Sequence, residues 1–197
     1  MDVLVACEYS GIVRDAFTNL GHNAISCDFL ESEKPGHHYL GDVRDIIFSK
    51  KWDIVIAHPP CTMLCNSVVR WLYNRDGSIN QDRWYLMVKA AEFFKWFLEL
   101  PFPFIAVENP IMHKHAAKII GMNAAQFIHP WEHGHGETKA TGLWLKGLPK
   151  IVPTNVVDGR EHRVWKLSQN NNGWKERSRT FPGIASAMAT QWSDFLK

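Results

Sequence analysis

A cysteine stands at the end of an apolar segment, on a turn made rigid by two prolines. The sequence Asp-Ile-Val-Ile-Ala-His-Pro-Pro-Cys-Thr covers residues 53–62 and places Cys61 after a segment typical of a buried strand. A second apolar segment, Phe-Ile-Ala-Val-Glu-Asn-Pro at 104–110, ends on the carboxylate of Glu108 and the amide of Asn109. A thiol and a carboxylic acid are the pair that can attack a pyrimidine ring at C6 while protonating N3.

Both groups follow strand-like segments, so a parallel sheet would bring them to one cleft. Ligands in open α/β sheets bind beyond the carboxyl ends of the strands. Residues 3–7 and 23–28 have the pattern of two further strands, and 11–20 between them has helical spacing. This order favours parallel pairing with a right-handed crossover. The sequence therefore predicts a doubly wound, Rossmann-like α/β fold with a mainly parallel sheet.

The alternation of strands and helices continues through the second apolar segment and then fades. Apolar residues recur at helical spacing over 81–100, a short helix is expected near 115–120, and 183–196 carries a helical stripe. The stretch 111–165 is irregular and rich in Gly, Pro, Trp and His. We predict a single domain over 1–197, with 111–165 as a small, reduced substrate-recognition insert.

Composition sets broad limits on compartment and partners. The net charge of +2 permits an acidic partner without requiring one. Four cysteines at unequal spacings, with no signal peptide ahead of them, indicate reduced thiols in a cytoplasmic compartment. The apolar runs are broken well before the roughly 20 residues that a membrane-spanning helix needs, so no membrane contact is expected.

Taken in order, these motifs resemble the cytosine-C5 DNA methyltransferase family, specifically its short phage or prophage members. The Pro-Cys pair that ends at Cys61 is similar to the nucleophile turn of that family, and the pair at 108–109 is similar to its Glu-Asn motif. The paired arginines of the family look like Arg177 and Arg179. The resemblance covers most of the chain apart from about residues 111–165.

The resemblance also implies S-adenosylmethionine as the cofactor. Asp28 matches the acidic residue that holds the cofactor ribose in the family, and Asp42 matches the aspartate that contacts the adenine. Of the glycines in the family's cofactor turn, Gly11 is present. The remaining candidate cofactor contacts lie in that turn or beside the matched positions, and they are Cys7, Glu8, Tyr9, Ser10, Phe29, Val43, His58 and Pro59.

The implied reaction is methyl transfer to C5 of cytosine in DNA through a covalent adduct. The Cys61 thiolate would add to C6 while protonated Glu108 donates to N3, with Asn109 positioning Glu108. A free thiol titrates near about pH 8.5, and Arg177 or Arg179 would supply the positive charge that favours the thiolate. An apolar strand end would keep Glu108 protonated by desolvation. The base would be flipped out of a duplex or presented on a single strand.

The region expected to recognise the substrate is short, so a short target, a single-stranded substrate, a dimer or a partner protein would have to complete DNA binding. Its tryptophans interleave with lysines and arginines, which is typical of a surface that stacks on bases and binds phosphate. They could equally close a small core under a long loop. The tryptophans concerned are Trp131, Trp144, Trp165 and Trp174. The histidines between 129 and 135 do not form a zinc pattern, and no metal site is predicted.

Other interpretations remain open. An exocyclic-amine methyltransferase, acting on adenine N6 or cytosine N4, also uses a Pro-Pro turn, although Cys61 then stands where such enzymes have an aromatic residue. A non-catalytic nucleic-acid-binding module that keeps the fold is a second alternative. Single residues have structural interpretations as well: Glu8 could cap the following helix, and Asp28 and Asp42 could form ordinary turns at strand ends.

Overall fold

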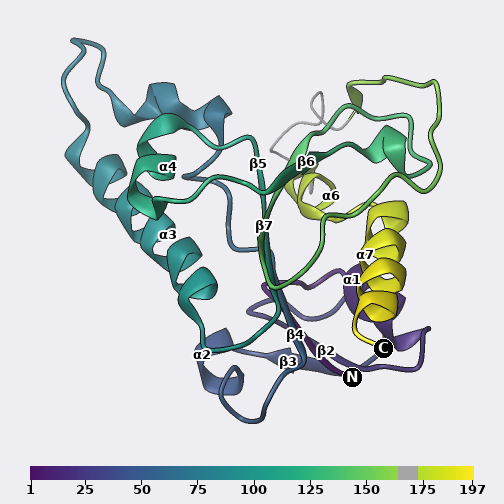
Figure 1. Ribbon diagram of the computed structural model, residues 1–197. Coiled ribbons are helices and arrows are strands. Elements are labelled where there is room, and N and C mark those ends of the chain that lie inside the picture. The colour runs from purple at the N-terminus through teal and green to yellow at the C-terminus, as the bar shows by residue number, and fades with distance from the viewer. Residues whose placement is uncertain (164–172) are drawn as a thin grey trace.

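The computed structural model of the protein describes residues 1–163 and 173–197, and its centre is a seven-stranded sheet (Figure 1). The strands are β1 (Asp2–Ala6), β2 (Asn23–Asp28), β3 (His38–Leu40), β4 (Ile54–Ala57), β5 (Ile105–Pro110), β6 (Gln126–Ile128) and β7 (Thr141–Lys146). Their order across the sheet is β3-β2-β1-β4-β5-β7-β6. The first five strands in this order are parallel, which confirms the predicted α/β fold with a mainly parallel sheet.

Helices cover both faces of the sheet. The α-helices in the described part of the chain are α1 (Ile12–Thr18), α2 (Val43–Ile46), α3 (Gln81–Glu99), α4 (Lys114–Ile120), α6 (Gly173–Ser178) and α7 (Pro182–Phe195). Two 3₁₀ helices, η1 (Asn66–Leu72) and η2 (Pro130–Glu132), complete the set. Helices α3 and α4 lie on one face, and α1 and α7 lie on the other (Figure 1). None of the helices described combines the length and apolar character of a membrane span.

The parallel strands end together at one edge of the sheet. Ala6 of β1 lies opposite both Cys27 of β2 and Ala57 of β4, and Ala57 lies opposite Val107 of β5. The strand order reverses between β1 and β4, because the chain first builds outward through β2 and β3 and then returns to add β4 and β5. Such a switch point opens a crevice at the carboxyl ends of the strands.

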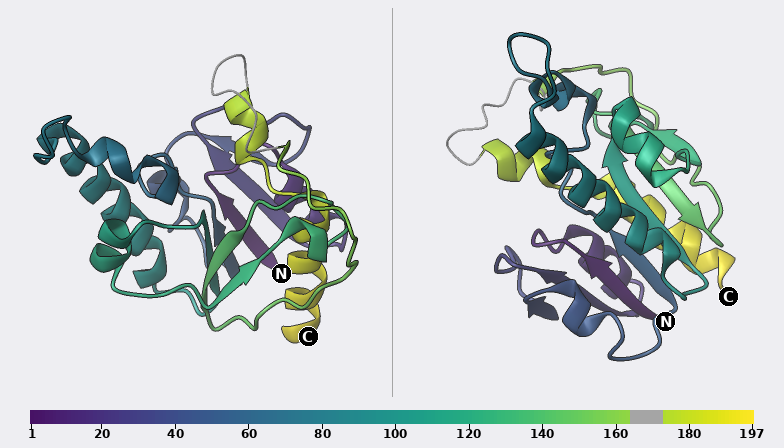
Figure 2. Two further views of the ribbon diagram at one scale, coloured as in Figure 1. Left: turned by 90° about the horizontal axis from the view of Figure 1, so that it is seen from above. Right: turned by 90° about the vertical axis from the view of Figure 1, so that its left-hand side faces the viewer.

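The stretch 111–165 contributes to the sheet itself, which the sequence analysis did not predict. Strands β6 and β7 fall within it and extend the sheet beyond β5, as Figure 2 shows in green. Both run antiparallel to their neighbours. Strand β7 shows no alternation of apolar and polar residues because Leu143 and Trp144 are both buried, one on each face. Positions 164 and 165 of the predicted insert, including Trp165, lie outside the described residues.

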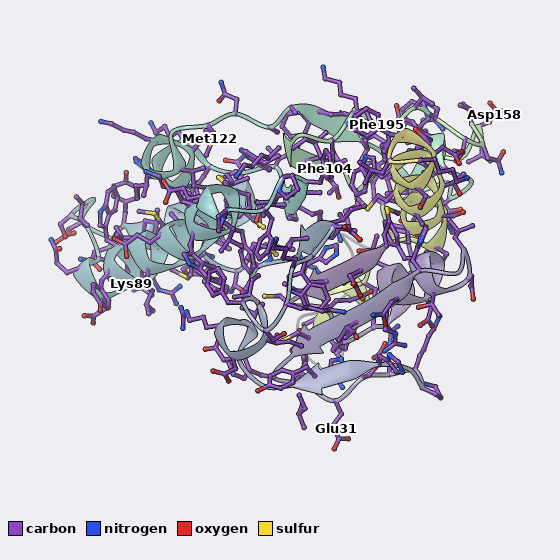
Figure 3. All side chains as sticks on the ribbon, turned by 60° about the horizontal axis from the view of Figure 1, so that its bottom comes forward. Glu31, Lys89, Phe104, Met122, Asp158 and Phe195 are labelled. Atoms are coloured by element: carbon purple, nitrogen blue, oxygen red, sulfur yellow. The ribbon has the colours of Figure 1, made fainter. Side chains whose placement is uncertain are left out.

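The long helices bury the stripes that their spacing predicts. On α3, Met87, Ala91, Phe94, Phe97 and Leu98 are buried. On α7, Ile184, Met188 and Trp192 are buried against β1, β4 and α1. Phe195 continues the α7 stripe in the sequence but is 53% exposed, and its ring meets the edge of Phe104 at a centroid distance of 6.2 Å (Figure 3).

A buried arginine fixes the loop between β2 and β3. Arg14 of α1 is 1% exposed, and its guanidinium pairs with Asp15. It also donates to the hydroxyls of Ser26 and Ser32 and to two carbonyls at 34–35. A buried charge is tolerable only when it is paired and fully hydrogen-bonded, as here. This cluster holds the loop that follows Asp28 beside the sheet edge.

We expect Trp192→Ala to lower the free energy of unfolding by about 3–5 kcal/mol, because it empties a fully buried site on α7. The substitution also removes the indole N–H that donates to the Pro149 carbonyl at 3.0 Å. Thr190→Ala, at an exposed position on the same helix, should change stability by less than about 0.5 kcal/mol. Chemical denaturation of both variants measures the difference. Equal stability of the two would show that α7 is not anchored as described.

Candidate active site

The residues predicted to do chemistry follow strands that end at the same edge of the sheet. Cys7 follows β1, Asp28 closes β2, His58 follows β4 and Glu108 lies near the end of β5. The shared register of these strands brings the four positions into one row. The edge therefore assembles groups that are far apart in the sequence.

His58 and Glu108 form a hydrogen-bonded pair. Because Ala57 lies opposite Val107 in the parallel pairing of β4 and β5, the next residue of each strand, His58 and Glu108, also lie side by side on one face. The distance from His58 Nδ1 to Glu108 Oε2 is 3.0 Å. The two side chains are 8% and 14% exposed, so the pair is shielded from water.

The pair shifts the pKa of each partner against the effect of burial. Burial disfavours the imidazolium, but the hydrogen bond and charge of Glu108 outweigh it and raise the pKa of His58. Burial likewise favours the neutral acid, but the imidazole of His58 and the charge of Lys139 outweigh it and lower the pKa of Glu108. The sequence analysis expected an apolar strand end to keep Glu108 protonated. That expectation is wrong for this arrangement, because a cationic partner lies against the carboxylate.

The side chains of Asn109 and Glu108 point to opposite faces of the sheet. Successive residues of a strand point to opposite faces, so the Asn109 side chain leaves the face that carries Glu108. Asn109 is fully buried, and its amide nitrogen donates to the Pro110 carbonyl at 2.6 Å. Its side-chain oxygen is buried without a hydrogen-bond partner among the described residues. The structure thus gives Asn109 no contact through which it would position Glu108.

The turn that presents Cys61 is tied to the segment that follows β5. The carbonyl of Cys61 accepts from the backbone N–H groups of residues 64 and 65, which makes a tight turn. His113 donates from Nε2 to the Met63 carbonyl at 2.9 Å, and its own backbone N–H donates to the Leu64 carbonyl. These bonds fix the Cys61 turn relative to β5. The segment 66–80 beyond it projects from the body of the protein, in blue in Figure 2.

Cys65 is the main influence on the Cys61 thiol. A side-chain hydrogen bond from Cys65 lowers the pKa of Cys61, and it outweighs the opposing effects of burial and of the Glu108 charge. The pKa of Cys65 is raised correspondingly, first by its bond to Cys61 and then by burial. A lowered thiol pKa increases the fraction of nucleophilic thiolate at neutral pH. In this arrangement the interaction between the two thiols favours the thiolate of Cys61.

Lys139 is the cation of the site, and the sequence analysis did not identify it as such. Its charge lowers the pKa of both Cys61 and Glu108. Its ammonium donates to the Arg177 carbonyl at 2.7 Å. Thr141, two residues later at the start of β7, forms a side-chain hydrogen bond with Glu108. No local sequence pattern marks Lys139. It lies just before β7, and the antiparallel pairing of β7 with β5 brings this segment close to Glu108.

The arginines expected to activate the thiol have other partners. Arg179 forms two hydrogen bonds to the Glu33 carboxylate, each 2.8 Å long. It also lines a hollow of about 10 Å³ beside Glu108, which has room for roughly one water molecule. Arg177 meets the site through its backbone carbonyl, which accepts from Lys139. Lys139 thus exerts on Cys61 and Glu108 a charge effect of the kind that the sequence analysis expected from these arginines.

In the turn after β1, the side chains of Glu8, Tyr9 and Ser10 form hydrogen bonds within the protein. The Glu8 carboxylate accepts from the backbone N–H groups of Val13 and Arg14 and from the hydroxyl of Ser10. Glu8 thus caps α1, as its structural interpretation predicts. Tyr9 donates to the Lys175 carbonyl at 2.8 Å and also pairs with the Ser178 hydroxyl, which ties α6 to this turn.

The turn also contains backbone conformations that favour glycine. Gly11, the residue before α1, has φ 69°. Cys7 has φ 57°, an uncommon conformation for a residue with a side chain. Burial raises the pKa of the Cys7 thiol, and the charges of Asp28 and Asp42 add to this effect. Cys7 therefore lies between these two carboxylates as a neutral thiol.

Asp28 closes β2 directly before an exposed aromatic residue, and Asp42 lies in the turn after β3. Burial raises the pKa of Asp28, and its Oδ1 accepts from the Leu30 N–H at 2.9 Å. Asp42 caps α2 by accepting from the Arg44 N–H, directly before Val43. Phe29 is 74% exposed. Carboxylates that accept hydroxyl protons, beside a ring that can stack, fit the ribose and adenine of a nucleoside cofactor. Pro59 follows His58 on the same edge.

The aromatic and basic residues of 111–165 divide between core and surface. Trp144 is buried and donates to the Met122 carbonyl. Trp131 carries the Arg160 guanidinium 3.8 Å from its ring centre and stacks on His129. Trp174, beyond this stretch, is 44% exposed and lies near Tyr9. Trp174 is therefore open to a ligand, as is Trp71 outside this stretch, which is 49% exposed, whereas Trp131 is half-buried.

Solved structures with a similar fold are methyltransferases. Entamoeba histolytica methyltransferase EhMeth matches with a TM-score of 0.51 and 15% sequence identity, covering 87% of this chain and 61% of that one. The chain shares the fold of this structure. The resemblance inferred from the sequence is confirmed at that level.

Two other solved structures match with TM-scores below 0.5. A candidate DNA modification methyltransferase encoded within an Escherichia coli prophage matches with a TM-score of 0.49 and 13% identity over 87% of this chain and 56% of that one. Schizosaccharomyces pombe Dnmt2 methyltransferase matches with a TM-score of 0.38 and 12% identity over 87% and 56%. The chain thus spans 56–61% of the length of these structures. No protein-family model matches the sequence, and no curated protein sequence is significantly similar to it.

We expect Cys65→Ala to raise the pKa of Cys61, because it removes the hydrogen bond that most favours the thiolate. Cys65→Ser keeps a donor at this position and should preserve more of the lowered pKa. The rate of Cys61 alkylation by iodoacetamide, followed against pH by mass spectrometry of the Cys61 peptide, reports the change. An unaltered pH dependence in the alanine variant would mean that the two thiols do not interact.

Proposed function

We propose that this protein transfers a methyl group from S-adenosylmethionine to C5 of cytosine in DNA through a covalent adduct at Cys61. The observation that carries the proposal is the placement of Cys61 on the turn that follows β4, close enough to the His58–Glu108 pair and to Lys139 for the charges of Glu108 and Lys139 to act on its thiol. A nucleophilic thiol and a carboxyl group at one sheet edge are what addition to a pyrimidine requires. The methyltransferase fold supports the same conclusion.

Each residue has a chemical task in this proposal. The Cys61 thiolate adds to C6 of the base, and the Glu108 carboxyl delivers a proton to N3, which makes C5 nucleophilic. Lys139 favours the thiolate before addition. Thr141 holds the Glu108 carboxyl by a hydrogen bond. After transfer, loss of the C5 proton allows the C6–S bond to break and restores Cys61.

The cofactor would lie along the ends of β1, β2 and β3. Asp28 would accept from the ribose hydroxyls, while Asp42 and Phe29 would flank the adenine. S-adenosylmethionine, when bound, supplies an electrophilic methyl group. Glu8 and Tyr9 belong to the structural frame of this site, because their side chains are engaged within the protein.

DNA is the proposed substrate, with the target base flipped out of the helix or presented on a single strand. Cytosine C5 and C6 lie within the stack of a duplex, so Cys61 can reach C6 only on an extruded or unpaired base. The half-buried Trp131 and its Arg160 partner provide a ring and a cation of the kind that bind single strands. This pair lies in the region proposed to recognise the substrate.

The decisive experiment traps the covalent adduct. DNA carrying 5-fluorocytosine is incubated with the protein and methyl-labelled S-adenosylmethionine, and an adduct that survives denaturation is sought. Fluorine at C5 blocks the final proton loss, so the thioether should accumulate. We expect Cys61→Ser to abolish adduct formation and methyl transfer while leaving cofactor binding intact, because Cys61 supplies the attacking atom.

Three results would contradict this assignment. Loss of cofactor binding together with transfer in Cys61→Ser would make Cys61 a structural residue. Cofactor binding by the parent protein without an adduct on duplex or single strands would redirect the search to another substrate. Absence of any cofactor binding would favour the non-catalytic, nucleic-acid-binding alternative.

We expect Asp28→Ala to weaken S-adenosylmethionine binding roughly 10- to 100-fold, the cost of losing a hydrogen bond to a charged acceptor. Isothermal titration of the cofactor measures this effect. The affinity for DNA should stay the same, since Asp28 lies at the cofactor side of the edge. Glu31→Ala, an exposed acidic position in the following loop, is the matched control. Equal cofactor affinity in both variants would refute the ribose contact.

A further inference from the structure

His58 is the side chain directly hydrogen-bonded to Glu108 on the neighbouring parallel strand. Its Nδ1 lies 3.0 Å from Glu108 Oε2, and both side chains are largely buried. The parallel register of β4 and β5 fixes this contact, so it does not depend on a mobile loop. A proton on either partner is therefore shared between two defined atoms.

The other ring nitrogen of His58, Nε2, lies away from Glu108. Nε2 is buried and has no hydrogen-bond partner in the part of the chain that the structure describes. A histidine with a purely structural role commonly forms hydrogen bonds through both ring nitrogens. Here the described interactions of the ring converge on Glu108. This arrangement suits a group that exchanges a proton with one partner.

The surrounding charges determine where that proton lies in the free protein. Glu108 on β5 and Glu8 after β1 both favour the imidazolium, while Lys139 before β7 disfavours it. Lys139 and the hydroxyl of Thr141 favour the carboxylate form of Glu108. Arg179 lines the same small hollow as Glu108. On balance the proton lies on His58, and Glu108 is a carboxylate.

We propose that His58 is the proton partner of Glu108, holding on Nδ1 the proton that Glu108 delivers to N3 of the pyrimidine; this inference rests on the proposed function. When the base is bound, the Nδ1–H bond breaks as the Oε2–H bond forms. Glu108 then donates this proton to N3, which leaves neutral His58 and the Glu108 carboxylate. When the C6–S bond breaks, N3 returns the proton to Glu108 and it passes back to His58.

The assignment gives His58 a different task from the cofactor contact that its position in the sequence suggests. It also explains how Glu108 can act as an acid although its neighbours favour the carboxylate. Because His58 acts through Glu108, it is a positioning and proton-supplying residue. Its role can be separated from simple packing by measuring where the proton is held.

The first test is the titration of His58 by NMR in the full-length protein, with the signal assigned by its absence in His58→Asn. We expect this imidazole to titrate above about 6.5, the value of an unperturbed histidine. Glu108→Gln should shift the titration to lower pH, since burial and Lys139 then act alone. A His58 that titrates at or below the unperturbed value, or that ignores Glu108→Gln, would overturn the proposal.

The second test is the pH dependence of adduct formation with DNA containing 5-fluorocytosine. His58→Asn places an amide N–H near the position of Nδ1, which retains the hydrogen bond but cannot carry the proton. Because Glu108 then holds the proton alone, the alkaline limb of the profile should move to lower pH. His58→Gln serves if the asparagine variant does not fold. A profile that keeps its alkaline limb in both variants contradicts the inference.

The two tests separate this inference from the proposed function. If the parent protein forms no adduct at any pH, the proposed function fails, and the NMR titration alone decides whether His58 and Glu108 share a proton. If adducts form but His58→Asn leaves the profile unchanged, the methyl-transfer proposal stands. The assignment of His58 then fails.

Discussion

The alignment of the parallel strands at one edge is the constraint on which the site depends. Hydrogen bonding between β4 and β5 places Ala57 opposite Val107, so the residues that follow, His58 and Glu108, must lie side by side. A shift of one residue in this register would turn Glu108 to the opposite face. The buried apolar residues of both strands prevent that shift, because it would expose them or bury a charge. Core packing and site geometry are thus set by the same interaction.

The site is held together by a balance of buried charge. Glu108 is stabilised as a carboxylate by His58, which follows β4, and by Lys139, just before β7, and Thr141 at its start. Lys139 also favours the thiolate of Cys61. The largest influence on this thiolate is the hydrogen bond from Cys65. Removing one charge would leave another buried and unpaired, which costs more than the pair contributes. The residues therefore act as a group, and substitutions among them should not be additive.

Helix α6 connects this group to the side of the edge proposed for the cofactor. Tyr9 bonds to residues 175 and 178, Arg179 bonds to Glu33, and Lys139 bonds to the Arg177 carbonyl. These contacts come from the turn after β1, the loop after β2 and the segment before β7. A conformational change in α6 would therefore alter the contacts of Lys139, which acts on the thiol, and those of Tyr9 on the cofactor side.

The sequence by itself determined the parallel core and the positions of Cys61 and Glu108 at strand ends, because continuous apolar runs broken by Gly and Pro are local signals. It did not reveal β7, which is buried on both faces and has no alternating pattern. Nor could it show that the charge of Lys139 acts on the thiol, or that His58 is hydrogen-bonded to Glu108. Those contacts depend on strand pairing between distant segments, and the pKa of a buried group depends on what pairing places beside it. Only the tertiary structure decided them.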